Sequence, residues 1–201
     1  MSGAILHLSQ DPAADQLLSE DPFALLIGMV LDQQIPLERA FRSPLDLRDR
    51  LGGRLEATQI AAMDGGQLAD IFAQPPALHR FPGSMARRVQ DLCRVLVTDY
   101  GGEAASVWEG AADGTDLLRR VRALPGFGEN KARIFVALLG KQLGIRPKGW
   151  RQAAGAFGEP GSRLSVADIT GPETLAEVRA HKAAMKAGAR AAAGAGGRGR
   201  P

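Results

Sequence analysis

Cysteine and histidine are scarce in this chain of 201 residues, and their scarcity excludes several kinds of site. The single cysteine, Cys93, excludes an internal disulfide and an iron–sulfur cluster held by four cysteines. It falls in an apolar series at helical spacing, which predicts a core position. The three histidines, His7, His79 and His181, are scattered without ligand spacing, so we expect no metal site.

Long apolar runs are also missing. No run reaches the roughly 20 apolar residues that a membrane-spanning helix needs. The N-terminus lacks the basic stretch and apolar stretch of a signal peptide. We therefore expect a soluble, cytoplasmic protein without a membrane partner.

Acidic residues are absent after Glu177, although the net charge of the whole chain is only +3. The basicity is concentrated at the C-terminal end, in Arg179, Lys182, Lys186, Arg190, Arg198 and Arg200. From Gly188 onwards the chain is almost entirely Ala, Gly and Arg, with no pattern that could form a core. We expect residues 188–201 to form a flexible basic tail. Such a tail either adds non-specific DNA affinity through counterion release or serves only solubility.

The most informative segment that is present is LPGFGENKA, residues 124–132. Amphipathic helical patterns flank it over 116–124 and 129–143, so we expect a helical hairpin over 115–143. Gly126 and Gly128 can adopt positive φ and leave no Cβ between the backbone and a ligand. The first amides of the second helix have no partner inside the helix, and the helix dipole adds positive potential there. The turn therefore predicts a phosphate site, although glycines at an ordinary helix joint would look the same.

A second segment, DPFALLIGMVLDQQI over 21–35, favours the functional interpretation. Asp21 is a typical N-cap, and residues 23–31 are apolar on all sides, which predicts a buried helix. The helix delivers Asp32, Gln33 and Gln34 to the edge of the core, and Ile35-Pro36 ends it. The two glutamines either face a ligand or satisfy the helix's own carbonyls.

The chain resembles the helix-hairpin-helix, Gly-Pro-Asp (HhH-GPD) superfamily of base-excision DNA glycosylases, which includes endonuclease III and the adenine and alkyladenine glycosylases. The resemblance rests on three segments: the buried helix that ends in Leu31-Asp32-Gln33-Gln34, a helix over 84–100 that begins MARRVQDL, and the hairpin over 124–132 with the pattern Gly-x-Gly-x-x-x-Ala. It covers roughly residues 20–150 and implies a divergent, bacterial-type member. The implied fold is all-α, with two helical lobes over residues 1–187 and a cleft between them.

The resemblance also implies a function, namely base-excision repair on double-stranded DNA by a monomeric, nucleoid-associated protein. The hairpin would bind the DNA backbone, and Gln34 would fill the gap left by an extruded nucleotide. The expected DNA-binding residues are Gly126, Phe127, Gly128, Asn130, Lys131, Gln33 and Gln34. We expect no cofactor, and a monovalent cation at the hairpin is the only ion we consider.

Two departures from the family pattern limit the chemistry. Bifunctional members carry a lysine where this chain has Asn130, and Lys131 is turned about 100° away around the helix. Lys131 is therefore expected to be a phosphate contact or a solvated charge, and no abasic-site lyase activity is expected. The family's catalytic aspartate is also missing, because residues 146–150 read RPKGW.

A carboxylate is needed to stabilise positive charge on the sugar or to activate water. Asp32 is the first candidate to replace the missing acid, with Asp168 and Glu159 behind it. Asp32 could equally be an ordinary residue at a helix end. Three functions stay open: a monofunctional DNA N-glycosylase acting on a damaged base, for example an alkylated one; a non-catalytic DNA lesion or structure binder; and an interaction protein whose hairpin does not bind DNA.

Helical patterns account for most of the remaining chain, and no segment alternates as a strand does. We expect a short helix that starts at Pro44 with Ser43 as its cap, helices over 57–63 and 66–73, and a helix over 84–100 capped by Ser84. Trp108 should lie in a short helix, and Trp150 should pack inward from a helix over 147–154. A final helix is expected over 172–187.

Overall fold

The computed structural model describes residues 5–195, apart from the side chains of 186 and 189–195. All of the regular structure in these residues is helical, which confirms the all-α prediction. The elements are α1 (Pro12–Glu20), α2 (Pro22–Leu31), α3 (Leu37–Arg50), α4 (Ala57–Ala62), α5 (Gly65–Ala73), α6 (Pro82–Tyr100), α7 (Ser106–Glu109), α8 (Gly114–Ala123), α9 (Glu129–Lys141), α10 (Trp150–Ala154), η1 (Gly155–Gly158), η2 (Val166–Asp168) and α11 (Pro172–Ala195).

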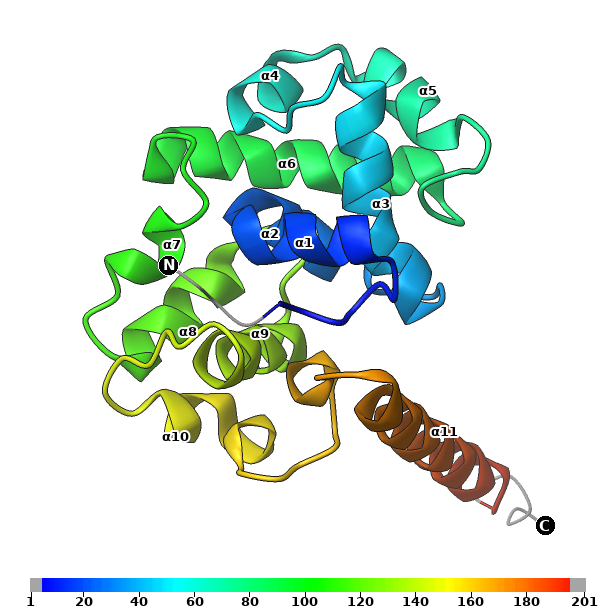
Figure 1. Ribbon diagram of the computed structural model, residues 1–201, viewed down its shortest axis with the longest axis vertical. Helices are drawn as coiled ribbons and strands as arrows, with labels where there is room; N and C mark the ends of the chain where they lie inside the picture. The colour runs from blue at the N-terminus through cyan, green and yellow to red at the C-terminus, as the bar shows by residue number, and fades with distance from the viewer. Residues whose placement is uncertain (1–4, 196–201) are drawn as a thin grey trace, which may run out of the picture.

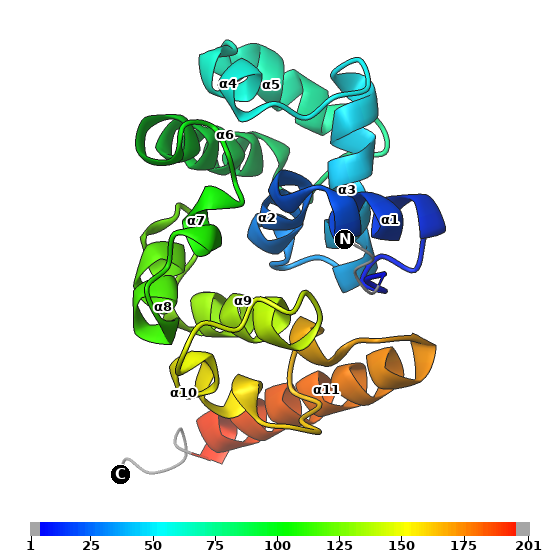
Figure 2. The ribbon, with the colours of Figure 1, turned by 60° about the vertical axis from the view of Figure 1, so that its left-hand side comes forward.

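Two groups of helices lie on either side of α2 (Figures 1 and 2). Helices α4, α5 and α6 form one group, and α8, α9 and α10 form the other. Helices α1 and α3 pack against α2 from outside both groups. Buried side chains from all of these helices belong to one continuous apolar cluster, so α2 links the two groups through the core.

Helix α2 is the buried helix that its sequence predicts. Every residue from Phe23 to Leu31 is buried. The Asp21 carboxylate caps the helix by accepting hydrogen bonds from the amides of Phe23 (2.8 Å) and Ala24 (3.2 Å). A Cβ at Gly28 would lie 2.7 Å from a ring carbon of Phe41, so the glycine lets α3 pack closely against α2.

Helix α3 differs from the short helix that the sequence predicts to begin at Pro44. The helix starts at Leu37 and contains Pro44, and Ser43 is a buried residue inside it. The Ser43 hydroxyl lies 2.8 Å from the carbonyl of Arg39 and 2.7 Å from the carbonyl of Leu78. The serine hydroxyl therefore lies between the carbonyl four residues back in α3 and the loop after α5.

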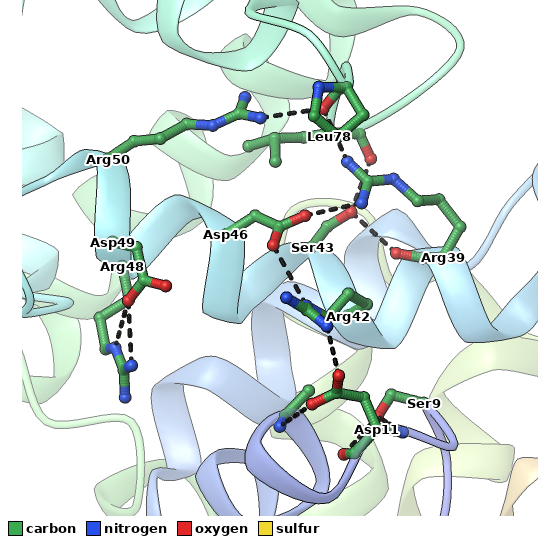
Figure 3. A network of polar contacts seen from close by, with 12 residues as sticks. Ser9, Asp11, Arg39, Arg42, Ser43, Asp46, Arg48, Asp49, Arg50 and Leu78 are labelled. Atoms are coloured by element: carbon green, nitrogen blue, oxygen red, sulfur yellow. Dashed lines mark hydrogen bonds and ion pairs between the residues drawn. The ribbon is translucent and has the colours of Figure 1, made fainter.

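Charged side chains tie α3 to its neighbours (Figure 3). The Arg42 guanidinium pairs with Asp11, the N-cap of α1, and with Asp46 on its own helix. Arg39 pairs with Asp46 at 2.6 Å and also donates to the carbonyls of Pro76 and Ala77. This network holds the loop after α5 and the start of α1 against one helix.

Several helix ends differ from the sequence prediction. Helix α1 was not predicted, although Asp11-Pro12 is a typical start signal. Helix α6 begins at Pro82, so Ser84 is not its cap. Helices α4, α5 and α7 lie where they were expected, and Trp108 is in α7.

Trp150 packs inward as predicted, although its helix, α10, covers only Trp150–Ala154. A Cβ at Gly140 of α9 would lie 2.4 Å from the Trp150 ring. A Cβ at Gly114, at the start of α8, would lie 2.6 Å from the backbone of Gly149 and Trp150. The two glycines therefore bring α8, α9 and α10 into direct contact.

The last helix is longer than expected. Helix α11 runs through Gly188 to Ala195, so residues 188–195 of the predicted tail are helical. Alanine has the highest helix propensity, and each of the two glycines, Gly188 and Gly194, costs only about 1 kcal/mol, so the alanine-rich sequence continues the helix. Residues 196–201 lie outside the described part. Among the described helices, none combines the length and apolarity needed to cross a membrane.

Candidate nucleic-acid interface

The predicted hairpin is present, with α8 and α9 joined by residues 124–128. The Phe127 amide donates to the carbonyl of Leu124 at 3.1 Å and closes the turn. Gly126 has a φ of +89°, and a Cβ there would lie 3.2 Å from Val30 of α2 and from Arg88 of α6. The turn therefore needs glycine for its conformation and for its contact with two other helices.

Gly128 serves a different purpose from the one expected. Its φ is −78°, a value open to any residue, and a Cβ there would meet no heavy atom within 4 Å. Gly128 is the N-cap of α9, and no side chain caps this helix. The amides of Glu129, Asn130 and Lys131 therefore have no capping partner, and Ala132 is the first to bond back, to the Gly128 carbonyl at 2.9 Å.

The one acid in this first turn is already neutralised by cations. Arg122 donates to the Glu129 carboxylate at 2.7 Å, and Arg133 does so at 2.8 Å. Hydrogen bonds from Arg122 and then Arg133 lower the pKa of Glu129. Gly128, Glu129 and Asn130 are exposed. An exposed helix start with uncapped amides and a paired acid remains suitable for an anion.

Phe127 does not contact solvent through its ring. The side chain is buried, and its ring centroid lies 5.6 Å from that of Phe135 in an edge-on arrangement. The ring is therefore not offered to a ligand, and a DNA contact of Phe127 would be made by its main chain. An apolar residue in a tight turn anchors the turn to the core.

The end of α2 lies against this hairpin, and its two glutamines differ. The Gln33 side chain donates to the Val30 carbonyl at 2.7 Å and accepts from Arg88 at 3.0 Å. Gln33 therefore satisfies its own helix end, which was the alternative to a ligand-facing role. Gln34 is exposed, and its backbone φ is +57°, a value that residues other than glycine rarely adopt. Strain of this kind is typical of functional positions, so Gln34 remains a candidate contact.

His79 also contacts the end of α2, a position that the sequence does not predict. Its Nδ1 accepts a hydrogen bond from the Phe81 amide at 3.0 Å, and its Nε2 lies 2.8 Å from the Gln33 carbonyl. Because Nδ1 accepts, the ring is neutral with its proton on Nε2. Burial is the largest cause that lowers the pKa of His79, and the charges of Lys131 and Arg88 lower it further.

His79 predicts a pH dependence of stability. Its pKa is below the ordinary value of 6.5 in the folded protein, so unfolding takes up a proton between these two values. The free energy of unfolding should therefore be highest above pH 6.5 and should decrease as the pH falls through this window. Urea unfolding at about pH 7.5 and about pH 5.5 measures the loss, and His79→Gln should reduce it. An equal loss in both proteins would contradict the assignment.

The surroundings of Lys131 differ from the solvated charge that the sequence allowed. Its ammonium donates to the carbonyls of Met29 (2.6 Å) and Val30 (3.3 Å) at the end of α2, so it is not a solvated charge. Burial lowers its pKa to about 8. The nearby Asp32 carboxylate opposes this shift, while Arg88 and Lys182 add to it. Lys131 therefore joins the hairpin to α2 and sits among three other charged groups.

Asp32, the candidate catalytic acid, is the C-cap of α2. Its amide donates to the Gly28 carbonyl at 3.0 Å, and its side chain is partly exposed. The carboxylate is close enough to Lys131 to raise the pKa of that amine. A carboxylate therefore lies near Lys131 of the hairpin, two residues before the exposed Gln34 in the chain.

The weaker candidate acids lie elsewhere. Asp168 is buried and accepts from Lys141 (2.6 Å) and Ser162 (2.9 Å), and it also forms a capping box with Ser165. It is a structural residue at the far end of α9. Glu159 is exposed after η1. Within residues 5–195 no group of acids, histidines or cysteine with metal-ligand spacing is found.

Comparison with known proteins found no relative of this chain. No family model matches the chain, and neither the curated proteins nor the solved structures contain a significant match. The resemblance to the glycosylases therefore depends on the three segments described above and on how the fold arranges them.

Proposed function

We propose that this protein binds double-stranded DNA through the α8–α9 hairpin and acts as a monofunctional DNA N-glycosylase. One observation carries the proposal. The three segments on which the resemblance rests are far apart in the sequence, yet they come together around Gly126, where an added Cβ would lie 3.2 Å from both Val30 of α2 and Arg88 of α6. A phosphate on the hairpin amides would lie next to the end of α2.

The division of roles follows from this geometry. Uncapped amides from Glu129 to Lys131 bind one phosphate and fix the register of the duplex without reading its sequence. Gln34 is exposed on a strained turn and takes the space of the extruded nucleotide. Gln33, Arg88 and His79 hold that turn in place through the hydrogen bonds described above.

Asp32 would supply the chemistry. The bond between C1′ of the sugar and the base nitrogen breaks, and its electron pair leaves with the base. Water then adds to C1′, and the Asp32 carboxylate accepts the proton and stabilises the positive charge that develops on the sugar. A cationic alkylated base is the substrate class that requires least help from the protein, because it leaves readily. Lys131 acts as a positioning residue, since its ammonium is held by two carbonyls of α2.

A second function, DNA binding without base release, is favoured by one observation. The segment in which the family carries its catalytic acid ends here in Trp150, which is buried against Gly140. That segment offers no carboxylate. If Asp32 does not replace it, the same surface inspects DNA without cutting a bond.

An assay of base release distinguishes the glycosylase from a protein that only binds DNA. The full chain is incubated with duplexes that carry one alkylated, deaminated or oxidised base, and alkali then cleaves any abasic site. We expect release from the alkylated duplex and binding to all three, with an affinity that falls steeply with salt. Binding without release at stoichiometric protein would support the second function. Binding to no duplex would overturn both and leave a hairpin that serves only packing or a protein partner.

A further inference from the structure

Helix α11 lies beside the candidate interface and is not used by the proposed function. Its first turns are anchored by Leu175 and Val178, which are buried, and by an ion pair between Arg179 and Glu38 in the first turn of α3. Because α3 begins shortly after Gln34, this pair holds α11 close to the end of α2. Beyond the anchor the helix projects past the other helices (Figure 1).

The projecting part is basic. Lys182 follows Arg179 by about one helical turn and is exposed. It is near enough to Lys131 for its charge to act on that amine. The sequence continues with Lys186 and Arg190 at four-residue spacing and contains no acid after Glu177. Lys182 thus lies near the hairpin, and the sequence of α11 beyond it contains further cations and no acid.

We propose that α11 is a second DNA-binding surface, which contacts the phosphates of the duplex flanking the site. This inference rests on the proposed function. With 24 residues, α11 is about 36 Å long, which is close to one turn of B-DNA at about 34 Å. The helix can therefore follow the backbone beyond the nucleotide under inspection.

A membrane surface fits this helix less well. Helices that lie in a lipid interface present Trp, Phe or Leu on the face opposite their cations. Past Val178 the sequence of α11 contains no such residue, and Met185 is the one large exposed apolar side chain among those described there. A helix of alanine and cations binds anionic surfaces through charge, and the neighbouring hairpin points to DNA as that surface.

The test compares two duplex lengths. Duplexes of about 10 and about 30 base pairs carry the same central lesion, and only the longer one extends under α11. Arg190→Glu, about two helical turns beyond Lys182, should weaken binding to the long duplex about tenfold at low salt and change binding to the short one by less than about twofold. For Arg190→Gln, the slope of log affinity against log salt on the long duplex should decrease by about 0.9. Arg54→Glu, the same charge change in the exposed loop after α3, is the matched control and should have no effect.

The outcomes separate the inference from the proposed function. A loss confined to the long duplex supports α11 as a second surface. Equal losses on both duplexes, or no loss on either, overturn it while the proposed function stands. If the wild-type protein binds neither duplex, the proposed function fails as well. Binding to vesicles with anionic lipid headgroups, lost in Arg190→Glu, would then assign α11 to a membrane surface instead.

Discussion

Gly128→Asp should abolish tight binding to duplex DNA without harming the fold. An aspartate at this N-cap places its carboxylate on the amides of α9 that would hold the phosphate, and it adds a negative charge next to the DNA backbone. The lost charge-assisted hydrogen bonds amount to about 2–3 kcal/mol, or a roughly 30- to 150-fold weaker affinity. Fluorescence anisotropy with a labelled duplex at low salt measures this change.

The same substitution should stabilise the protein slightly. Gly128 has an extended conformation, its Cβ position is open, and α9 has no side-chain cap, so aspartate meets no clash and fills an empty capping role. The expected gain over glycine is a few tenths of a kcal/mol, measured by urea unfolding. Gly128→Ala is the matched control, because it leaves the amides free and uncharged and should retain binding. A stable Gly128→Asp protein that still binds DNA as well as wild type would rule out the hairpin as the phosphate site.

Asp32→Asn should lower the rate of base release by about 100- to 1000-fold, because it removes the charge that stabilises the sugar cation. DNA affinity should be unchanged or higher, since one negative charge leaves the interface. The rate is measured under single-turnover conditions on the alkylated duplex. Asp99→Asn, at the exposed end of α6, makes the same chemical change away from the site and should not alter the rate.

A second readout for Asp32→Asn does not depend on activity. Since the Asp32 carboxylate raises the pKa of Lys131, its removal should lower that pKa below about 8. An NMR titration of labelled lysine side chains follows the change. If base release survives in Asp32→Asn while the pKa of Lys131 falls, Asp32 is a neighbour of Lys131 and not the catalytic acid.

The local features of the site could be predicted from the sequence. Asp21, Pro22 and an unbroken apolar run define α2, and two glycines between amphipathic patterns define the hairpin. These signals depend on residues within one or two turns of each other. The end of α11 differs from the prediction, because the sequence from 188 has no pattern that could form a core, yet the helix propensity of its alanines continues the helix to Ala195.

The long-range features could not be predicted in this way. Lys131 bonds to the carbonyl of Met29, which is 102 residues away, and His79 bonds to the carbonyl of Gln33, which is 46 residues away. Only the folded chain shows that Lys131 is turned towards α2 and not towards solvent. Ser43 was taken for a cap for the same reason, because its second partner, Leu78, lies in a distant loop.

Amide chemical shifts test most directly whether the hairpin holds a DNA phosphate. In a ¹H–¹⁵N titration with an undamaged duplex at low ionic strength, the amides of Gly128, Glu129, Asn130 and Lys131 should shift most and return as salt is added. Binding that leaves these four amides unmoved, or no binding to any duplex, would contradict the account.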